Sequence, residues 1–226
     1  MRVLVVTAVA PEAEAVDAAD VGARARGNGT VDVIVGGVGP ASAAARAATA
    51  LSRAPVPYDL VVSAGIGGGF VPHAPVGSLV VADAIVAADL GAQTPDGGWL
   101  PVDELGFGRA THLPPAGLAR RAAQAAGALC APVLTVSTVT GTAARATELT
   151  ARHPRAAAEA MEGFGVAEAA AAHSLPVLEV RAISNPVGPR DRSAWRIKDA
   201  LTALTDGFRQ LSPVFSEPSE PSEEPK

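Results

Sequence analysis

Short apolar runs rich in valine and isoleucine recur along the whole chain, and longer stretches with helical character lie between them. The runs that predict strands are 3–8, 31–35, 59–64, 79–86, 133–137 and 176–183. Helices are expected over 41–52, 116–128, 143–152, 165–173 and 196–211, where alanine, the best helix former, is frequent. Strands that alternate with helices are typical of a mostly parallel sheet covered by helices. The sequence therefore predicts an α/β fold.

The chain has 226 residues, which is enough for one sizeable domain with a buried core. We expect that domain to cover 1–211, because 212–226 consist mostly of proline, serine and glutamate. Such a segment buries too little apolar surface to offset the entropy of ordering. A disordered acidic tail is therefore expected over 212–226.

The net charge and the cysteine content limit which partners the protein can bind and which cellular compartment it suits. The net charge of −5 argues against nucleic acid, which needs a basic surface facing its phosphates. Residues 61–82 lack charged side chains, but their five glycines and two prolines exclude a membrane-spanning helix and favour strand, turn, strand. The single cysteine, Cys130, cannot form an internal disulfide and fits a reducing compartment. We expect a cytoplasmic protein with no membrane partner.

Glycines and a few polar side chains follow the expected strands. Ligands of open parallel sheets bind outside the carboxyl ends of the strands. The segments found there are Glu12, 36–39, 65–69, 138–141 and 184–185. The sequence therefore predicts one site at this edge of the sheet, with 36–39 and 65–69 as glycine loops.

The two glycine loops do not match the known phosphate-binding patterns. Neither continues into the third glycine and helix of a dinucleotide site, and neither has the lysine of a P-loop. A phosphorolytic enzyme would usually place arginines there, yet the nearest is Arg46, further into the next helix. This favours water as the nucleophile. The four histidines show no metal-ligand spacing, so we expect no metal and no cofactor.

Four segments carry a resemblance to a known family: 7–14 (TAVAPEAE), 63–70 (SAGIGGGF), 160–163 (AMEG) and 181–188 (RAISNPVG). Over 1–211 the chain resembles the nucleoside phosphorylases and nucleosidases. The resemblance implies a three-layer α/β/α fold with a mixed, mostly parallel central sheet. It also implies a catalytic domain that cleaves the N-glycosidic bond of a small nucleoside with water, in a homo-oligomer.

The resemblance also implies roles for individual residues. Glu12 would be the general base that activates water against C1′, and Glu162 would accept hydrogen bonds from the ribose hydroxyls. The residues expected to contact base, sugar or 5′ substituent are Gly67, Val139, Thr140, Met161 and Trp195. It places a strand that ends at Met161 and a helix after Gly163, although the alanines of 156–161 favour helix. Apart from the resemblance, Glu12 can be read as an ordinary first-turn helix glutamate.

Asn185 departs from one branch of the family. The methylthioadenosine/adenosylhomocysteine nucleosidases carry an aspartate there, which protonates a departing adenine. Asparagine cannot act as a general acid, but its amide can accept from a purine N–H and donate to a 6-oxo group. The 6-oxopurine phosphorylases resemble this chain in having asparagine. Asn185 therefore favours hypoxanthine or guanine as the leaving base.

The segment from Asn185 to Trp195 looks like the futalosine hydrolases, a group within the family that acts in menaquinone biosynthesis. Futalosine carries hypoxanthine and, at its 5′ end, an aryl ketone with a carboxylate. Arg190 or Arg192 could meet that carboxylate and Trp195 could stack on the ring. Alternatively both arginines pair with Asp191 or Asp199 at the surface.

Three other functions remain open at this point. The first is a 6-oxopurine nucleoside phosphorylase, and the second is the methylthioadenosine/adenosylhomocysteine nucleosidase. The third is a binding module without catalysis, since a fold does not determine function. The joint presence of Glu12 and Glu162 argues against the third.

Overall fold

The computed structural model describes residues 1–21 and 30–216 of the chain. The strands are β1 (Arg2–Thr7), β2 (Thr30–Val35), β3 (Leu60–Gly69), β4 (Leu79–Val81), β5 (Ile85–Ala87), β6 (Gly91–Gln93), β7 (Trp99–Pro101), β8 (Thr111–His112), β9 (Leu129–Cys130), β10 (Val133–Thr135), β11 (Ala158–Ala160) and β12 (Val177–Pro186). The helices are α1 (Ala10–Asp17), α3 (Pro40–Arg53), α4 (Ala116–Ala126), α5 (Ala143–Arg152), α6 (Gly163–Ala172) and α7 (Ile197–Ser216), with a 3-10 turn at Arg192–Ala194.

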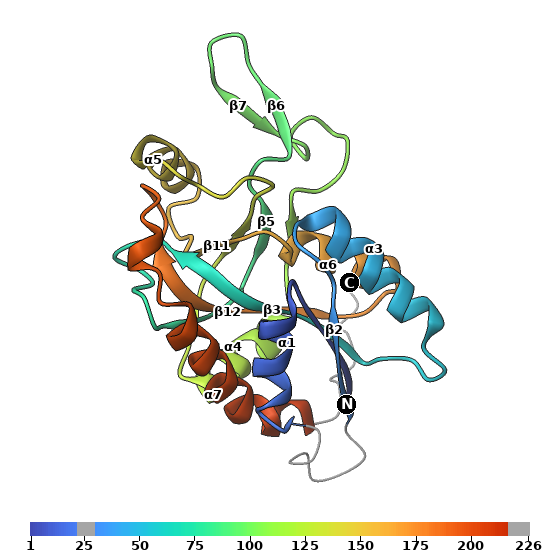
Figure 1. The fold of residues 1–226 in the computed structure, drawn as a ribbon. Helices are drawn as coiled ribbons and strands as arrows, with labels where there is room; N and C mark the ends of the chain where they lie inside the picture. The colour runs from blue at the N-terminus through green and yellow to red at the C-terminus, as the bar shows by residue number, and fades with distance from the viewer. Residues whose placement is uncertain (22–29, 217–226) are drawn as a thin grey trace.

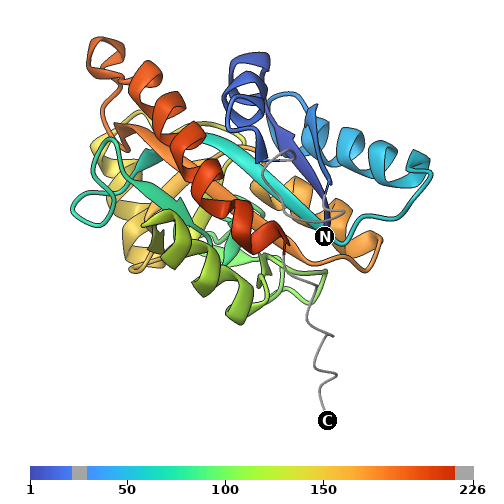
Figure 2. The same cartoon turned by 90° about the horizontal axis from the view of Figure 1, so that it is seen from below.

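Helices cover both faces of one large sheet. Helices α1, α4 and α7 lie on one side, and α3 and α6 lie on the other (Figures 1 and 2). Strand β1 illustrates how one strand contributes to the packing on both faces. Val3 and Val5 pack toward α1, α4 and α7, while Leu4 and Val6 pack toward α3 and α6. Successive side chains of a strand point to opposite faces, so a fully apolar strand can supply both cores.

The sheet is mixed and mostly parallel, as predicted. Its order is β8-β5-β10-β11-β3-β12-β4-β9, and β2 and β1 join it beside β3. The pairs of β3 with β1 and with β12 are parallel, whereas β11 runs antiparallel to β3 and β4 runs antiparallel to β12. Strands β6 and β7 form a separate hairpin that projects from the rest (Figure 1).

Strand β3 brings distant segments together. Its first four residues, Leu60–Ser63, pair with β1, and its last two residues, Gly68 and Gly69, pair with β11. Strands β1 and β11 therefore lie on the same edge of β3 and run toward each other. The chain that leaves β1 and the chain that leaves β11 consequently meet beside the middle of β3.

The segment 65–69, expected to be a loop, belongs to strand β3, so that prediction was wrong. Glycine is needed here because of what lies beside the strand. A Cβ atom on Gly65 would lie 2.5 Å from Glu12 Oε1 and 2.8 Å from Arg181 Nη1. The glycines therefore let side chains approach the strand closely, and do not break it.

Two further boundaries differ from the predictions. The single strand expected over 79–86 is two strands, because β4 pairs with β12 while β5 pairs with β10 in another part of the sheet. Helix α7 continues to Ser216, into the segment expected to be disordered. Val214 and Phe215 are buried there, and the Phe215 ring packs on Phe208 at 6.2 Å between centroids. Residues 217–226 of the expected tail lie outside the described residues.

The alanines of 156–161 favour a helix and the family resemblance implies a strand. The structure has a strand there, β11. Ala158 and Ala160 of β11 are buried in the core shared with α3 and α6, and α6 begins at Gly163. Tertiary packing overrides the helix propensity of alanine here. Within 1–21 and 30–216, no helix combines the length and the apolar character needed to cross a membrane.

Candidate active site

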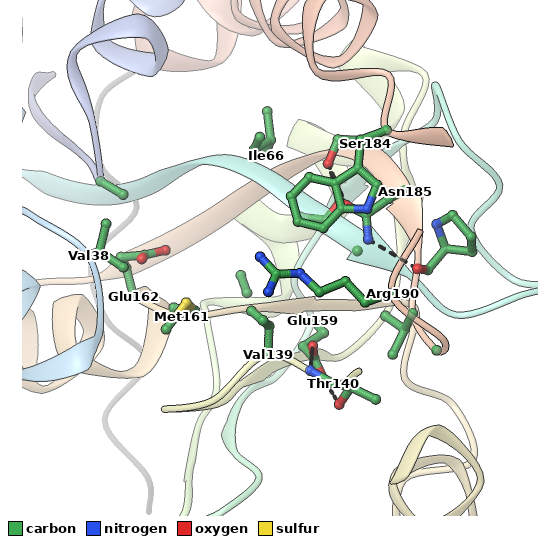
Figure 3. A pocket seen from close by; sticks show the side chains of 18 of the residues that line it. Val38, Ile66, Val139, Thr140, Glu159, Met161, Glu162, Ser184, Asn185 and Arg190 are labelled. Atoms are coloured by element: carbon green, nitrogen blue, oxygen red, sulfur yellow. Dashed lines mark hydrogen bonds between the residues drawn. The ribbon is translucent and has the colours of Figure 1, made fainter. Parts of the chain in front are cut away.

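A cavity of about 370 Å³ opens where β1, β3, β11 and β12 converge. The residues that the sequence analysis expected to act on or contact the substrate line this cavity, with the exception of Arg192: Glu12, Gly67, Val139, Thr140, Met161, Glu162, Asn185, Arg190 and Trp195. Figure 3 shows several of them, contributed by segments far apart in the chain. Residues from each of the segments expected at the strand ends thus meet at one cavity, and the role of each residue stays a prediction.

Glu12 lies in the first turn of α1, just after β1 ends. Its side chain is buried, and three backbone N–H groups donate to its carboxylate. Ala8 N and Val9 N donate to Oε2 at 2.9 and 3.2 Å, and Ile66 N donates to Oε1 at 2.9 Å. The bond from Val9 is the ordinary helix-capping contact, and the bond from Ile66 fastens the carboxylate to β3. Glu14, by contrast, is exposed.

Glu162 follows β11 and is also buried. Gly39 N donates to its Oε1 at 3.1 Å, and Arg181 Nη1 lies 3.3 Å from its Oε2. Gly39 belongs to the first of the two glycine segments, so that segment helps to position Glu162. The two carboxylates of Glu12 and Glu162 therefore line the same cavity from the converging ends of β1 and β11.

Beneath these carboxylates lies Arg181, which is fully buried in β12. Its Nε donates to Glu179 Oε1 at 2.9 Å and its Nη2 donates to Ser63 Oγ at 2.9 Å. Burial acts to lower the pKa of Arg181, but the carboxylates of Glu179, Glu162 and Glu12 outweigh it and raise that pKa. Arg181 therefore stays charged and is surrounded by acceptors.

Asn185 lies at a β-bulge in β12, where the register against β3 shifts between Ile183 and Asn185. Such a bulge redirects a side chain at the end of a strand. Ser184 Oγ donates to Asn185 Oδ1 at 2.8 Å, and Asn185 Nδ2 donates to Pro186 O at 3.0 Å. The amide keeps one N–H and further acceptor capacity for a ligand.

Arg190 and Trp195 lie next to each other. The Arg190 guanidinium carbon is 5.7 Å from the centre of the Trp195 ring, within cation–π range. Arg192 does not line the cavity. Asp191 and Asp199, the expected partners of these arginines, are bonded instead to Ser193 and Arg196.

Sequence reasoning missed three buried charged residues, Glu159, Glu179 and Arg181. Glu159, which precedes Glu162 by three positions in the sequence, lines the cavity. Glu179 and Arg181 are buried beneath the cavity. A signal was available: Glu179 and Arg181 interrupt an otherwise apolar strand at a spacing of two, which places both on one face. Charges in a buried strand need partners. Among the described residues, no cluster of three or more histidine, cysteine or acidic side chains could hold a metal ion.

The family model of the phosphorylase superfamily matches residues 21–210, and the chain belongs to that family. A futalosine hydrolase from Streptomyces coelicolor is 68% identical to it over 187 residues, which are 81% of this chain and 79% of that protein. A futalosine hydrolase from Acidothermus cellulolyticus is 45% identical over 94% of this chain and 91% of its own length. A solved structure of a futalosine hydrolase mutant from Helicobacter pylori has the same fold. Its TM-score is 0.78 at 14% identity, over 93% of this chain and 98% of that one.

Proposed function

We propose that this protein hydrolyses the N-glycosidic bond of futalosine and releases hypoxanthine and dehypoxanthine futalosine. The observation that carries the proposal is the 68% identity to a futalosine hydrolase over most of both chains. The presence of Glu12, Glu162 and Asn185 in one cavity supports it independently. Menaquinone biosynthesis through futalosine is the setting that this activity implies.

Glu12 acts as the general base in this proposal. It accepts a proton from water as the water oxygen bonds to C1′. The electron pair of the breaking C1′–N9 bond moves to the departing hypoxanthine, which leaves as an anion and takes up a proton from solvent. Glu162 accepts hydrogen bonds from the 2′ and 3′ hydroxyls, and its charge stabilises the cationic, oxocarbenium-like sugar. The backbone N–H groups that hold both carboxylates support these roles, because a positioned base loses little freedom in the transition state.

Charge favours water over phosphate as the nucleophile. The sugar end of the cavity presents Glu12 and Glu162, and the arginine beneath them, Arg181, is already bonded to Glu179 and Ser63. A phosphate anion placed there would face two carboxylates, and the guanidinium beneath them already serves Glu179, Ser63 and Glu162. The two carboxylates at the sugar end therefore support a hydrolase and speak against a phosphorylase.

The other contacts follow from the positions of the lining residues. Asn185 hydrogen-bonds the departing hypoxanthine, and Val139, Thr140, Gly67 and Met161 surround the base and sugar. Arg190 meets the carboxylate at the 5′ end of futalosine, and Trp195 stacks on its aryl ring. Arg190 is favoured over Arg192 because only Arg190 of the two lines the cavity. The homo-oligomer and the cytoplasmic location stay predictions.

The proposal is tested by offering futalosine, inosine and methylthioadenosine to the purified protein and identifying the released base. We expect rapid release of hypoxanthine from futalosine, slower release from inosine, and little adenine from methylthioadenosine. Preferred release of adenine would identify a methylthioadenosine nucleosidase instead. A protein that binds futalosine and releases no base would be a binding module.

A further inference from the structure

Helices α3 and α6 both begin at the edge of the cavity, and the residues that start them meet there. Gly39 is the N-cap residue of α3, and Glu162 is the N-cap residue of α6. Gly39 N donates to Glu162 Oε1 at 3.1 Å, whereas Oε2 lies against Arg181. Figure 3 shows Glu162 beside Val38, the residue before Gly39. The position of Oε1 therefore depends on how closely α3 approaches α6.

Gly165, in the first turn of α6, sets that approach. It is buried, and a Cβ atom there would overlap the carbonyl oxygen of Pro40 and lie 2.7 Å from the carbonyl carbon. These are backbone atoms of the first residue of α3, so no side-chain rotation could relieve the overlap. Any side chain at 165 would push the two helices apart. Glycine is a poor helix former, so its presence in this turn fits a demand for close contact.

The contact at Gly165 and the hydrogen bond to Glu162 belong to one closed circuit. The carbonyl of each N-cap residue accepts the first hydrogen bond of its own helix at 3.1 Å, which ties that residue to the helix. Pro40 lies between Gly39 and the rest of α3, and its ring fixes its φ angle. A shift of Pro40 away from Gly165 is therefore passed on to the N–H of Gly39, and so to Glu162 Oε1.

We propose that Gly165 is a positioning residue for Glu162: because it has no side chain, the N–H of Gly39 reaches the carboxylate and fixes its orientation. This inference rests on the proposed function, in which Glu162 accepts from the 2′ and 3′ hydroxyls of the ribose. A carboxylate held at both oxygens keeps the orientation that suits these hydroxyls, whereas one released at Oε1 turns about its side-chain bonds. The preference for ribose over 2′-deoxyribose therefore reports the position of Glu162.

The direct test compares futalosine with its 2′-deoxy analogue as substrates of Gly165→Ala. We expect the ratio of kcat/KM for futalosine over the 2′-deoxy analogue to fall about 10-fold, the worth of one hydrogen bond to a charged group. Gly207→Ala in α7 is the control, because it also crowds the core. A Cβ atom on Gly207 would lie 2.7 Å from Leu79 Cδ1, and its nearest neighbours all belong to Leu79. This control should keep the wild-type ratio even where its stability falls.

A double-variant comparison shows whether Gly165 acts through Glu162. Glu162→Ala removes the carboxylate and should itself lower the ratio. Adding Gly165→Ala to Glu162→Ala should then lower the ratio little further, because both changes act on the same contact. Two independent falls that multiply would overturn the inference. An unchanged ratio in Gly165→Ala, with both substrates slowed equally, would also overturn it and leave Gly165 as a packing residue.

If Gly165→Ala does not fold, Gly39→Ala decides. Gly39 has a φ of +89°, which residues with a side chain rarely adopt, and nothing lies within 4 Å of its Cβ position. Gly39→Ala therefore turns the N–H without crowding the core, and it should lower the same ratio. An unchanged ratio would overturn the inference. Failure of the wild-type protein to cleave futalosine would instead reject the proposed function, so the two failures are distinguishable.

Discussion

Arg181 Nε donates to Glu179 Oε1 across 2.9 Å, and neither side chain is exposed to solvent. The two residues are separated by one position on β12, so they lie on the same face of the strand. The same guanidinium reaches Ser63 and lies 3.3 Å from Glu162 Oε2. Glu179 and Arg181 thus connect the buried centre of the sheet to a carboxylate of the candidate active site.

The first prediction concerns this buried pair. Arg181→Met should lower the free energy of unfolding by about 3–5 kcal/mol, because it leaves Glu179 as an uncompensated buried charge. The double variant Arg181→Met/Glu179→Leu should lose much less than the sum of the two single variants. Urea denaturation of the four proteins measures the coupling. Additive losses would mean that the two side chains do not stabilise each other.

Gly163 gives the second prediction. A Cβ atom on Gly163 would overlap the carboxylate of Glu179, which is buried and bonded to Arg181 and so cannot easily move. Gly163→Ala should therefore cost about 1–3 kcal/mol of unfolding free energy, as overpacking in a core usually does. Gly141→Ala is the matched control, since nothing lies within 4 Å of its Cβ position. If thermal melts found both variants equally stable, the packing of Glu179 against Gly163 would be wrong.

The third prediction addresses the general base. Glu12→Gln keeps the shape of the side chain but cannot accept a proton from water at neutral pH. We expect kcat for futalosine to fall by about 10²- to 10⁴-fold, the usual contribution of a general base. Glu14→Gln, two residues away and exposed, should behave as the wild type. A Glu12→Gln protein as active as its parent would remove Glu12 from the mechanism.

The fourth prediction separates two arginines that are close in sequence. Arg190 lines the cavity beside Trp195, and Arg192 does not. Arg190→Ala should raise KM for futalosine about 10- to 100-fold, as the loss of a charged hydrogen bond would. Arg192→Ala should leave KM unchanged. Inosine lacks the 5′ carboxylate, so its KM should change little in either variant, and an equal change for both nucleosides would contradict the assignment.

The sequence predicted the layers well and the packing around the site poorly. Alternating apolar and helical segments located α5 at its observed bounds and β1 within one residue, because both have strong local signals. The strand-end rule found the cavity because it depends only on topology. By contrast, β3 extends through Gly69 where 65–69 pair with β12 and its last two residues pair with β11, and the absent side chain of Gly65 leaves room for Glu12 and Arg181. Contacts between such distant residues leave no local pattern.

Glu159 illustrates the same limit within the site. It lies in an alanine-rich stretch that favours helix, where a glutamate suggests a solvated face. The pairing of β11 with β3 and with β10 is what orients that residue toward the cavity. The resemblance to the family predicted the strand at Met161, yet it assigned no role to Glu159. Which carboxylates face the substrate is therefore decided by the register of the sheet.

The most direct test of the central claim is the phosphate dependence of base release from futalosine. The purified protein should release hypoxanthine at the same rate with and without inorganic phosphate, and the sugar product should be free dehypoxanthine futalosine in both cases. Release that requires phosphate and yields a sugar 1-phosphate would contradict the account. It would show that Glu12 and Glu162 surround a phosphate site and that the protein is a phosphorylase.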